Sequence, residues 1–207
     1  ARHANMLYRA GFIREGHELA RRAIRIDPFS PDSHRMMFIG ALASNDLDSA
    51  QEYLRLIEEL TGARETVYAT LFFAVRQDWD KAAAILREDG WMDFASREKW
   101  FDTMMDTLEG RMPAEEFGRL FRDLEEDGEI EPVTAVSIYS LVGLPEEALR
   151  CLSGLESLML MDNTVWLPIY DEMRALPGFP AAMAKHGVVE LWEERGMPQG
   201  IRAAPPS

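Results

Sequence analysis

A turn residue followed five positions later by a small residue recurs along this chain, and that spacing constrains the fold more than any other feature. Four pairs show it: Gly11 and Gly16, Asn45 and Ala50, Gln77 and Ala82, and Gly143 and Ala148. The small residues at 16 and 50 lie 34 positions apart, and those at 50 and 82 lie 32 positions apart. A period near 34, with turn residues between apolar segments, is typical of helical hairpins stacked in an array. The sequence therefore predicts an all-α fold that presents surfaces to partners.

Helical periodicity and stop signals predict where the helices begin and end. Asp27 and Pro28 end the second helix, because proline disfavours helical geometry in the residue before it, and Pro31 suits a first turn. The predicted helices span residues 2–9, 15–26, 31–44, 47–60, 64–77, 79–87, 94–110, 112–124, 132–142 and 145–158. Further helical segments are predicted at 163–176, 177–187 and 188–196.

These helices predict one repeat domain over residues 1–198. Its repeats are expected at about 1–30, 31–62, 63–90, an irregular 91–130 and 131–160, followed by a capping unit at 161–198. Residues 199–207 have no packing pattern, and we expect them to form a flexible tail. The opening residues enter in the middle of a helical pattern, so we expect a truncated first helix.

The excess of acidic residues limits the classes of partner. The formal net charge is −14, whereas surfaces for nucleic acid or anionic membranes need clustered Lys and Arg. We therefore expect no direct nucleic-acid binding and no membrane insertion. The excess serves either the solubility of exposed helix faces or the attraction of a basic partner.

The sequence also bears on compartment. The lone Cys151 allows no internal disulfide and is expected in the core. No apolar stretch approaches the ~18 residues of a membrane span, and no signal peptide opens the chain. We expect a cytoplasmic protein, and a periplasmic location is the alternative if a signal or transmembrane segment lies upstream.

Nothing in the sequence has the pattern of a catalytic or metal site. The histidines are scattered and form no short-spaced pair with each other or with Cys151, as a zinc site needs. No glycine-rich phosphate loop and no nucleophile elbow occurs. We therefore expect no enzyme activity, no metal and no cofactor.

The hairpin positions resemble the tetratricopeptide repeat (TPR) family. The four small residues match the family's close-approach position, and Pro28 resembles its repeat-closing proline. The chain departs from the pattern at Gly62, where the family has a proline, and at Asp89, where it has a small residue. The resemblance implies a right-handed superhelix of stacked antiparallel helical hairpins that ends in a C-terminal capping unit.

Residues 163–198 are similar to the closing segment of repeat domains in certain bacterial regulators, which carry the repeats behind a winged-helix DNA-binding domain or a nucleotide cyclase domain. The coinciding positions are Trp166, Pro168, Tyr170, Pro177, Phe179, Gly187 and Trp192. The resemblance implies a protein-interaction and sensory module of a larger bacterial regulatory protein, acting in signalling or transcription regulation. A stand-alone scaffold or envelope assembly factor that self-associates, for instance as a homodimer, is the alternative.

In a tetratricopeptide array the first helix of each pair lines the partner-binding side. The resemblance therefore places the expected partner-binding residues at Arg35, Ile39, Leu42, Arg64, Val67 and Leu71. An apolar groove rimmed by Arg35 and Arg64 suits an amphipathic helix or an extended apolar peptide, so the expected partner is a protein or peptide. The alternative is that these side chains only pack against neighbouring helices.

Overall fold

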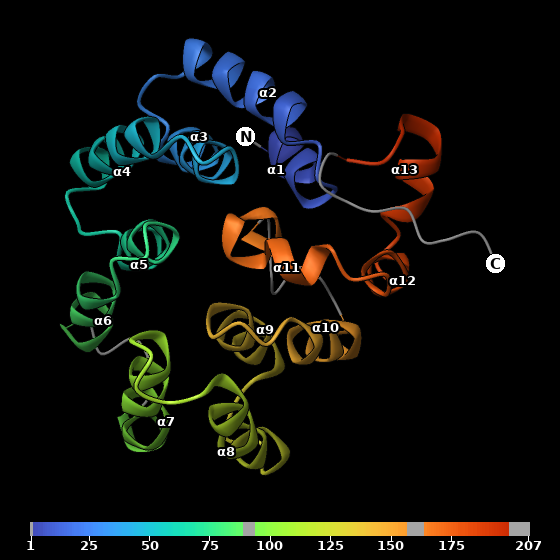
Figure 1. The fold of residues 1–207 in the computed structure, drawn as a ribbon. Helices are drawn as coiled ribbons and strands as arrows, with labels where there is room; N and C mark the ends of the chain where they lie inside the picture. Colours follow the sequence, from blue (N-terminus) through green and yellow to red (C-terminus); the bar gives the residue numbers. More distant parts are fainter. Residues whose placement is uncertain (1, 89–93, 157–163, 199–207) are drawn as a thin grey trace. The chain divides into compact units, whose positions relative to one another are not determined.

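The computed structural model describes residues 2–88, 94–156 and 164–198. Within these ranges every regular element is a helix and no strand occurs, as Figure 1 shows. The all-α fold class predicted from the periodicity is therefore confirmed. The tail predicted at 199–207 lies outside the described residues.

The helices follow the predicted order closely. The ten long ones are α1 Arg2–Arg9, α2 Ile13–Ile26, α3 Pro31–Ala43, α4 Leu47–Thr61, α5 Thr66–Val75, α6 Trp79–Glu88, α7 Phe94–Leu108, α8 Ala114–Glu126, α9 Pro132–Leu141 and α10 Pro145–Gly154. Shorter elements follow: the 3-10 turns η2 Thr164–Trp166 and η3 Pro168–Tyr170, then α11 Asp171–Arg174, α12 Phe179–Ala184 and α13 Val189–Arg195.

Among the ten long helices, the predicted bounds differ most at the end of α10, and every other bound differs by at most two residues. The tenth helix was expected to reach residue 158, but α10 ends at Gly154, and Leu155 already has extended geometry with ψ of 136°. The amide of Leu155 bonds to the carbonyl of Leu152 at 3.2 Å, which tightens the last turn. Glycine is a poor helix former, so the helix stops there although the apolar spacing continues.

The chain divides into two compact units. Among the described residues, 2–88 and 164–168 form unit 1, and 94–156 and 169–198 form unit 2. Unit 1 therefore contains the hairpins α1–α2, α3–α4 and α5–α6 together with η2. Unit 2 contains the hairpins α7–α8 and α9–α10 and the short elements α11, α12 and α13.

The turns inside the hairpins share one backbone geometry. The amide of Asn45 bonds to the carbonyl of Leu42 at 3.0 Å, and the amide of Asp46 bonds to that of Ala41 at 2.8 Å. This is the Schellman arrangement, which needs a left-handed residue directly after the helix. The four turn residues of the sequence pattern all have positive φ: Gly11 at 84°, Asn45 at 55°, Gln77 at 59° and Gly143 at 79°.

The same geometry explains the spacing of five. The residue after the turn residue accepts the first hydrogen bond of the next helix, so Asp46 accepts from the amide of Ala50 at 3.0 Å. The small residue thus always lies in the first turn of the second helix, where the two helices of a hairpin meet. At Gly16 an added Cβ would lie 2.9 Å from the Tyr8 ring. The first hairpin therefore closes at a residue that has no side chain.

In unit 1, the third helix is the most enclosed. Every residue of α3 from Ser33 to Leu42 except Arg35 is buried. Phe38 meets Tyr68 of α5 edge to face, with ring centroids 5.4 Å apart. Because α2, α4 and η2 also contact α3, this helix carries the core of unit 1.

The segment at 164–168 completes unit 1. Val165, Trp166 and Leu167 are all buried, and η2 contacts α1 and α3. The capping unit predicted at 161–198 is therefore shared in the structure: Trp166 packs with the first repeat, whereas Tyr170, Phe179 and Trp192 belong to unit 2.

Unit 2 is built around an aromatic cluster. Phe121 of α8 stacks on Phe117 at 5.2 Å and meets the rings of Trp100 and Tyr139 edge to face at 5.7 and 5.2 Å. The rings come from α7, α8 and α9, so they join the irregular part of the chain to the α9–α10 hairpin. Tyr170 adds a hydrogen bond of 2.8 Å between its hydroxyl and that of Ser137.

Candidate functional site

Arg35 is engaged inside unit 1. Its guanidinium donates to Asp32 at 2.8 Å and to Glu65 at 2.6 Å, and it lies 6.0 Å from the centre of the Tyr68 ring. The hydrogen bond to Glu65 raises the pKa of Arg35. These contacts tie α3 to the start of α5, so Arg35 has a structural role whether or not it meets a partner.

The other five predicted residues do not form one exposed surface. Ile39 and Leu42 are 1% and 0% exposed, so their side chains reach a partner only if their neighbours move. Leu71 is half-buried, whereas Val67 is 39% exposed. Arg64 is exposed and pairs with Glu88 at 2.6 Å. Surface pairs of this kind contribute only about 0–1 kcal/mol, so Arg64 can exchange its partner readily.

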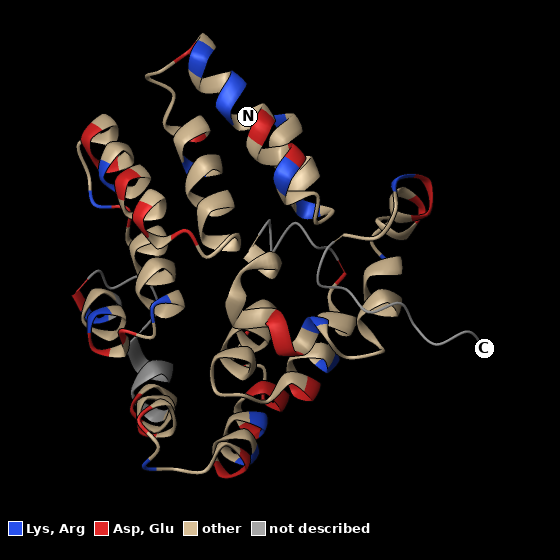
Figure 2. Ribbon diagram, turned by 45° about the horizontal axis from the view of Figure 1, so that its top comes forward, with Lys and Arg blue, Asp and Glu red and all other residues tan. Residues whose placement is uncertain are grey.

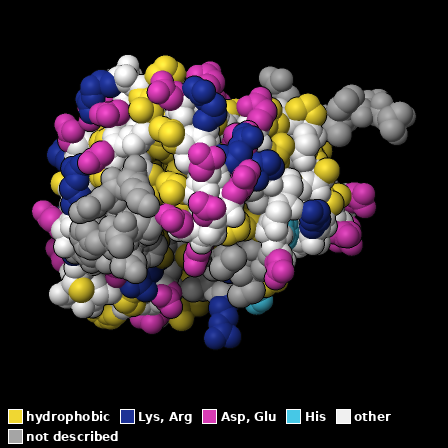
Figure 3. All heavy atoms as spheres, turned by 90° about the horizontal axis from the view of Figure 1, so that it is seen from below, with side chains coloured by type: hydrophobic (Ala, Val, Ile, Leu, Met, Phe, Trp, Pro, Cys, Tyr) yellow, Lys and Arg dark blue, Asp and Glu magenta, His cyan; other side chains and the backbone are white. Residues whose placement is uncertain are grey.

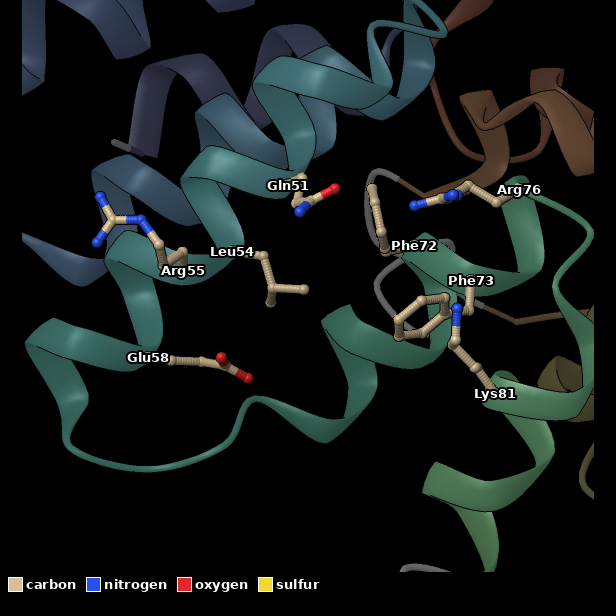
Figure 4. Close-up of a pocket in the computed structure, with 8 residues that line it drawn as sticks. All are labelled: Gln51, Leu54, Arg55, Glu58, Phe72, Phe73, Arg76 and Lys81. Carbon is tan, nitrogen blue, oxygen red and sulfur yellow. The ribbon is translucent and has the colours of Figure 1, made fainter.

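A pocket of about 310 Å³ lies next to this region, between α4 and the α5–α6 hairpin. Figure 4 shows its lining: Gln51, Leu54, Arg55 and Glu58 from α4, Phe72 and Phe73 from α5, Arg76 from the following turn and Lys81 from α6. We call it the α4–α6 pocket. All eight residues belong to unit 1.

The apolar part of the pocket is aromatic and aliphatic. The rings of Phe72 and Phe73 meet edge to face at 5.2 Å, and Leu54 faces them from α4. Phe72 is 2% exposed, so it forms the floor, while Phe73 is half-buried and borders the opening. The floor is therefore fixed by packing, which favours a pocket that exists before a ligand arrives.

Two cations lie over the two rings. The guanidinium of Arg76 is 5.3 Å from the centre of Phe72, and the ammonium of Lys81 is 5.4 Å from that of Phe73. Contacts of this kind stabilise a cation by about 0.5–1 kcal/mol at exposed sites, so both side chains are held at the rim.

The cations differ in their other contacts. Lys81 donates to Asp78 at 2.8 Å, and this hydrogen bond lowers the pKa of Asp78. Arg76 is exposed and forms no ion pair with any residue that the structure describes. Arg55 pairs with Glu52 and Glu59 on its own helix and is turned away from the phenylalanines in Figure 4. Arg76 is thus the cation most available to a ligand.

The opposite side of the pocket is polar. Glu58 accepts a hydrogen bond from the backbone amide of Glu65 at 3.3 Å, which holds this carboxylate at the α4–α5 connection. Gln51 supplies an amide. None of the eight lining residues is a Ser, Cys or His. The chemistry of the pocket suits an apolar side chain next to a carboxylate, with the carboxylate at Arg76.

Among the described residues, no group of three His, Cys, Asp or Glu side chains is placed to hold a metal ion. None of the helices in the described ranges has the length and apolar character needed to cross a bilayer.

The α4–α6 pocket was not predicted from the sequence, because the resemblance to the repeat family places the partner surface on the first helix of each hairpin. The pocket takes half of its lining from the second helix α4 and one residue from a turn. A signal was present: Phe72 and Arg76 are four positions apart, a spacing that stacks two side chains on one helix face.

Comparisons with protein-family models, with curated proteins and with solved structures find no match to this chain.

Proposed function

We propose that this chain is a helical-repeat module of the tetratricopeptide type that binds a protein segment in the α4–α6 pocket. The observation that carries the proposal is the lining of that pocket, where a packed aromatic floor lies beneath a cation with no ion pair. A binding site typically combines an apolar surface with a few polar groups that fix orientation. The segment we expect presents an apolar side chain to Phe72 and Phe73 and a carboxylate to Arg76.

The repeated hairpins support a binding role for the fold. Units with one turn geometry and one spacing can stack side by side and expose long surfaces between successive hairpins. The α4–α6 pocket lies at such a junction, between the second and third hairpins. The resemblances described from the sequence extend the proposal to a sensory module of a bacterial regulator, in which the bound segment biases an effector domain.

The test is a selection of peptides from a random library against the full chain, followed by dissociation constants for the selected peptides. Arg76→Glu and Phe73→Ala should each weaken binding roughly tenfold or more, as expected for interface residues of these types. Arg119→Glu, an exposed arginine of unit 2, is the matched control and should bind as the unsubstituted chain does.

The outcome also separates the pocket from the surface predicted from the sequence. Arg64→Glu and Val67→Ser change the exposed members of that surface and leave the pocket lining intact. If these two variants lose binding while Arg76→Glu keeps it, the site lies on the first helices and the pocket assignment is wrong. Selected peptides without acidic residues would contradict the proposed role of Arg76.

A further inference from the structure

The first two helices of this acidic chain are basic. Residues 1–30 hold six arginines against three carboxylates, so the whole acid excess of the chain, −14 overall, lies after them. Figure 2 shows basic positions along α2. In contrast, the face shown in Figure 3 mixes acidic, basic and apolar side chains. The charge of α2 is therefore a local feature that the general need for solubility does not explain.

The arginines of α2 share an exposed surface. Arg14, Arg21 and Arg25 are separated by seven and four positions, which places them along one helix face. With Arg22 they form what we call the arginine stripe, and all four are exposed. Arg14 approaches Glu15 at 3.8 Å, whereas Arg21, Arg22 and Arg25 form no ion pair within the described part of the chain. Three of the four arginines of the stripe are thus available to the carboxylates of a partner.

Two large apolar side chains stand at the end of the stripe. Ile26 is 86% exposed and Phe29 is 77% exposed, the highest values among the large hydrophobic residues that the structure describes. The turn that carries them is ordered: the Asp27 carboxylate accepts from the amide of Phe29 at 3.1 Å. A ring nitrogen of His34 contacts the Pro28 carbonyl at 2.9 Å. The exposure of Phe29 is therefore built into the turn.

We propose that the arginine stripe, together with Ile26 and Phe29, is a docking surface for an acidic protein segment that carries an apolar side chain. Arginine pairs with carboxylates through two parallel hydrogen bonds. Arginine and aromatic residues are also enriched at the centres of protein interfaces. The surface is separate from the α4–α6 pocket, because no residue of α2 lines that pocket.

A protein segment fits this surface better than a membrane or a nucleic acid. Glu18 lies on the same face as the stripe, and Asp27 lies next to Ile26. A continuous array of phosphates would meet both carboxylates as well as the net charge of −14. A protein segment can place carboxylates opposite the arginines and hydrogen-bond donors opposite Glu18. Local complementarity therefore favours the protein partner.

The test uses the full chain and a fluorescent peptide in which glutamates alternate with leucine and phenylalanine, measured by anisotropy at physiological salt. The chain should bind this peptide and should bind its glutamine counterpart at least about tenfold more weakly, a difference of ~1.4 kcal/mol. Arg21→Glu/Arg25→Glu should lose binding to a similar extent, and so should Phe29→Ser. Equal binding of the two peptides, or no binding of the acidic one, overturns the proposal.

Matched controls keep the result specific. Arg119→Glu changes an exposed arginine of unit 2, and Leu120→Ser changes a side chain that is 51% exposed. Both should bind as the unsubstituted chain does. Loss of binding in Arg76→Glu but not in Arg21→Glu/Arg25→Glu would assign the peptide to the α4–α6 pocket and overturn the proposal. Thermal melting checks that every variant is folded, and Arg21→Gln/Arg25→Gln repeats the test without introducing acids. Retention of the chain on phosphatidylserine vesicles or duplex DNA, abolished by the same substitutions, would assign the surface to those partners instead.

Discussion

The indole nitrogen of Trp166 donates a hydrogen bond of 3.1 Å to the backbone carbonyl of Arg9, a residue 157 positions earlier in the chain. Arg9 ends α1, where carbonyls have no partner within the helix. The Trp166 side chain is 3% exposed. It therefore both covers the end of α1 and supplies a hydrogen-bond donor to the Arg9 carbonyl.

We expect Trp166→Phe to lower the free energy of unfolding by about 1–3 kcal/mol, because the Arg9 carbonyl loses its donor while most of the ring packing remains. Trp166→Ala should cost about 3–5 kcal/mol, because it also leaves a cavity. Urea unfolding followed by circular dichroism measures both. If the two substitutions lower the free energy of unfolding equally, the packing of the buried Trp166 ring contributes nothing to stability and this prediction is wrong.

Gly40 and Gly154 should respond in opposite directions to the same change. A Cβ at Gly40 would lie 2.3 Å from the Tyr8 hydroxyl and 2.8 Å from Nδ1 of His17, so Gly40→Ala should destabilise the protein by about 1–3 kcal/mol. At Gly154 nothing lies within 4 Å, and Gly154→Ala should stabilise by roughly 0.5 kcal/mol through helix propensity. The comparison requires only the two melting curves, and a loss of stability in Gly154→Ala would contradict the described environment of α10.

The turn positions allow a matched pair of substitutions. Gln77 has a φ of 59°, a conformation that costs a residue with a side chain about 1–2 kcal/mol, whereas Gly143 has a φ of 79° without that cost. We expect Gln77→Gly to raise the free energy of unfolding by up to about 1 kcal/mol and Gly143→Gln to lower it by a similar amount. Stability that falls in Gln77→Gly would show that its side chain makes contacts that outweigh the backbone strain.

Cys151 should be unreactive in the folded protein. Burial, followed by the charge of Glu125, raises the pKa of its thiol to about 12. Since the reference value is roughly 8.5, the neutral thiol contributes stability below pH ~8.5, and this contribution is lost as the pH rises towards the folded value. Alkylation by iodoacetamide at pH 8 should be slow and should accelerate with urea as the protein unfolds. Rapid labelling without urea would place the thiol at the surface.

Local signals in the sequence predicted the hairpins well. Ser30 accepts a hydrogen bond from the amide of Ser33 at 3.3 Å, and Asp46 accepts one from that of Ser49 at 3.1 Å, so α3 and α4 begin at capping residues. The turn residue and the first hydrogen bond of the next helix set the spacing of five through the backbone. Such features depend on neighbours in the sequence, which is why they could be predicted.

Features made by distant residues were not predictable in this way. Ile39 and Leu42 were assigned to a partner surface by their register, but α3 is enclosed on nearly all sides. Its apolar run Met36–Leu42 was a signal of that burial, since a helix that is apolar all round is buried. The α4–α6 pocket and the position of Trp166 depend on which elements meet in space, and no spacing along the chain encodes that.

The contact between Arg9 and Trp166 also sets an order of events during protein synthesis. A ribosome adds about 5–20 residues per second, so roughly 10–30 s pass between the emergence of α1 and that of its last covering segment. During that interval the first hairpin leaves the exit tunnel with part of its apolar surface uncovered. The nascent chain therefore offers the α1–α2 hairpin to chaperones until translation has delivered residues 164–168.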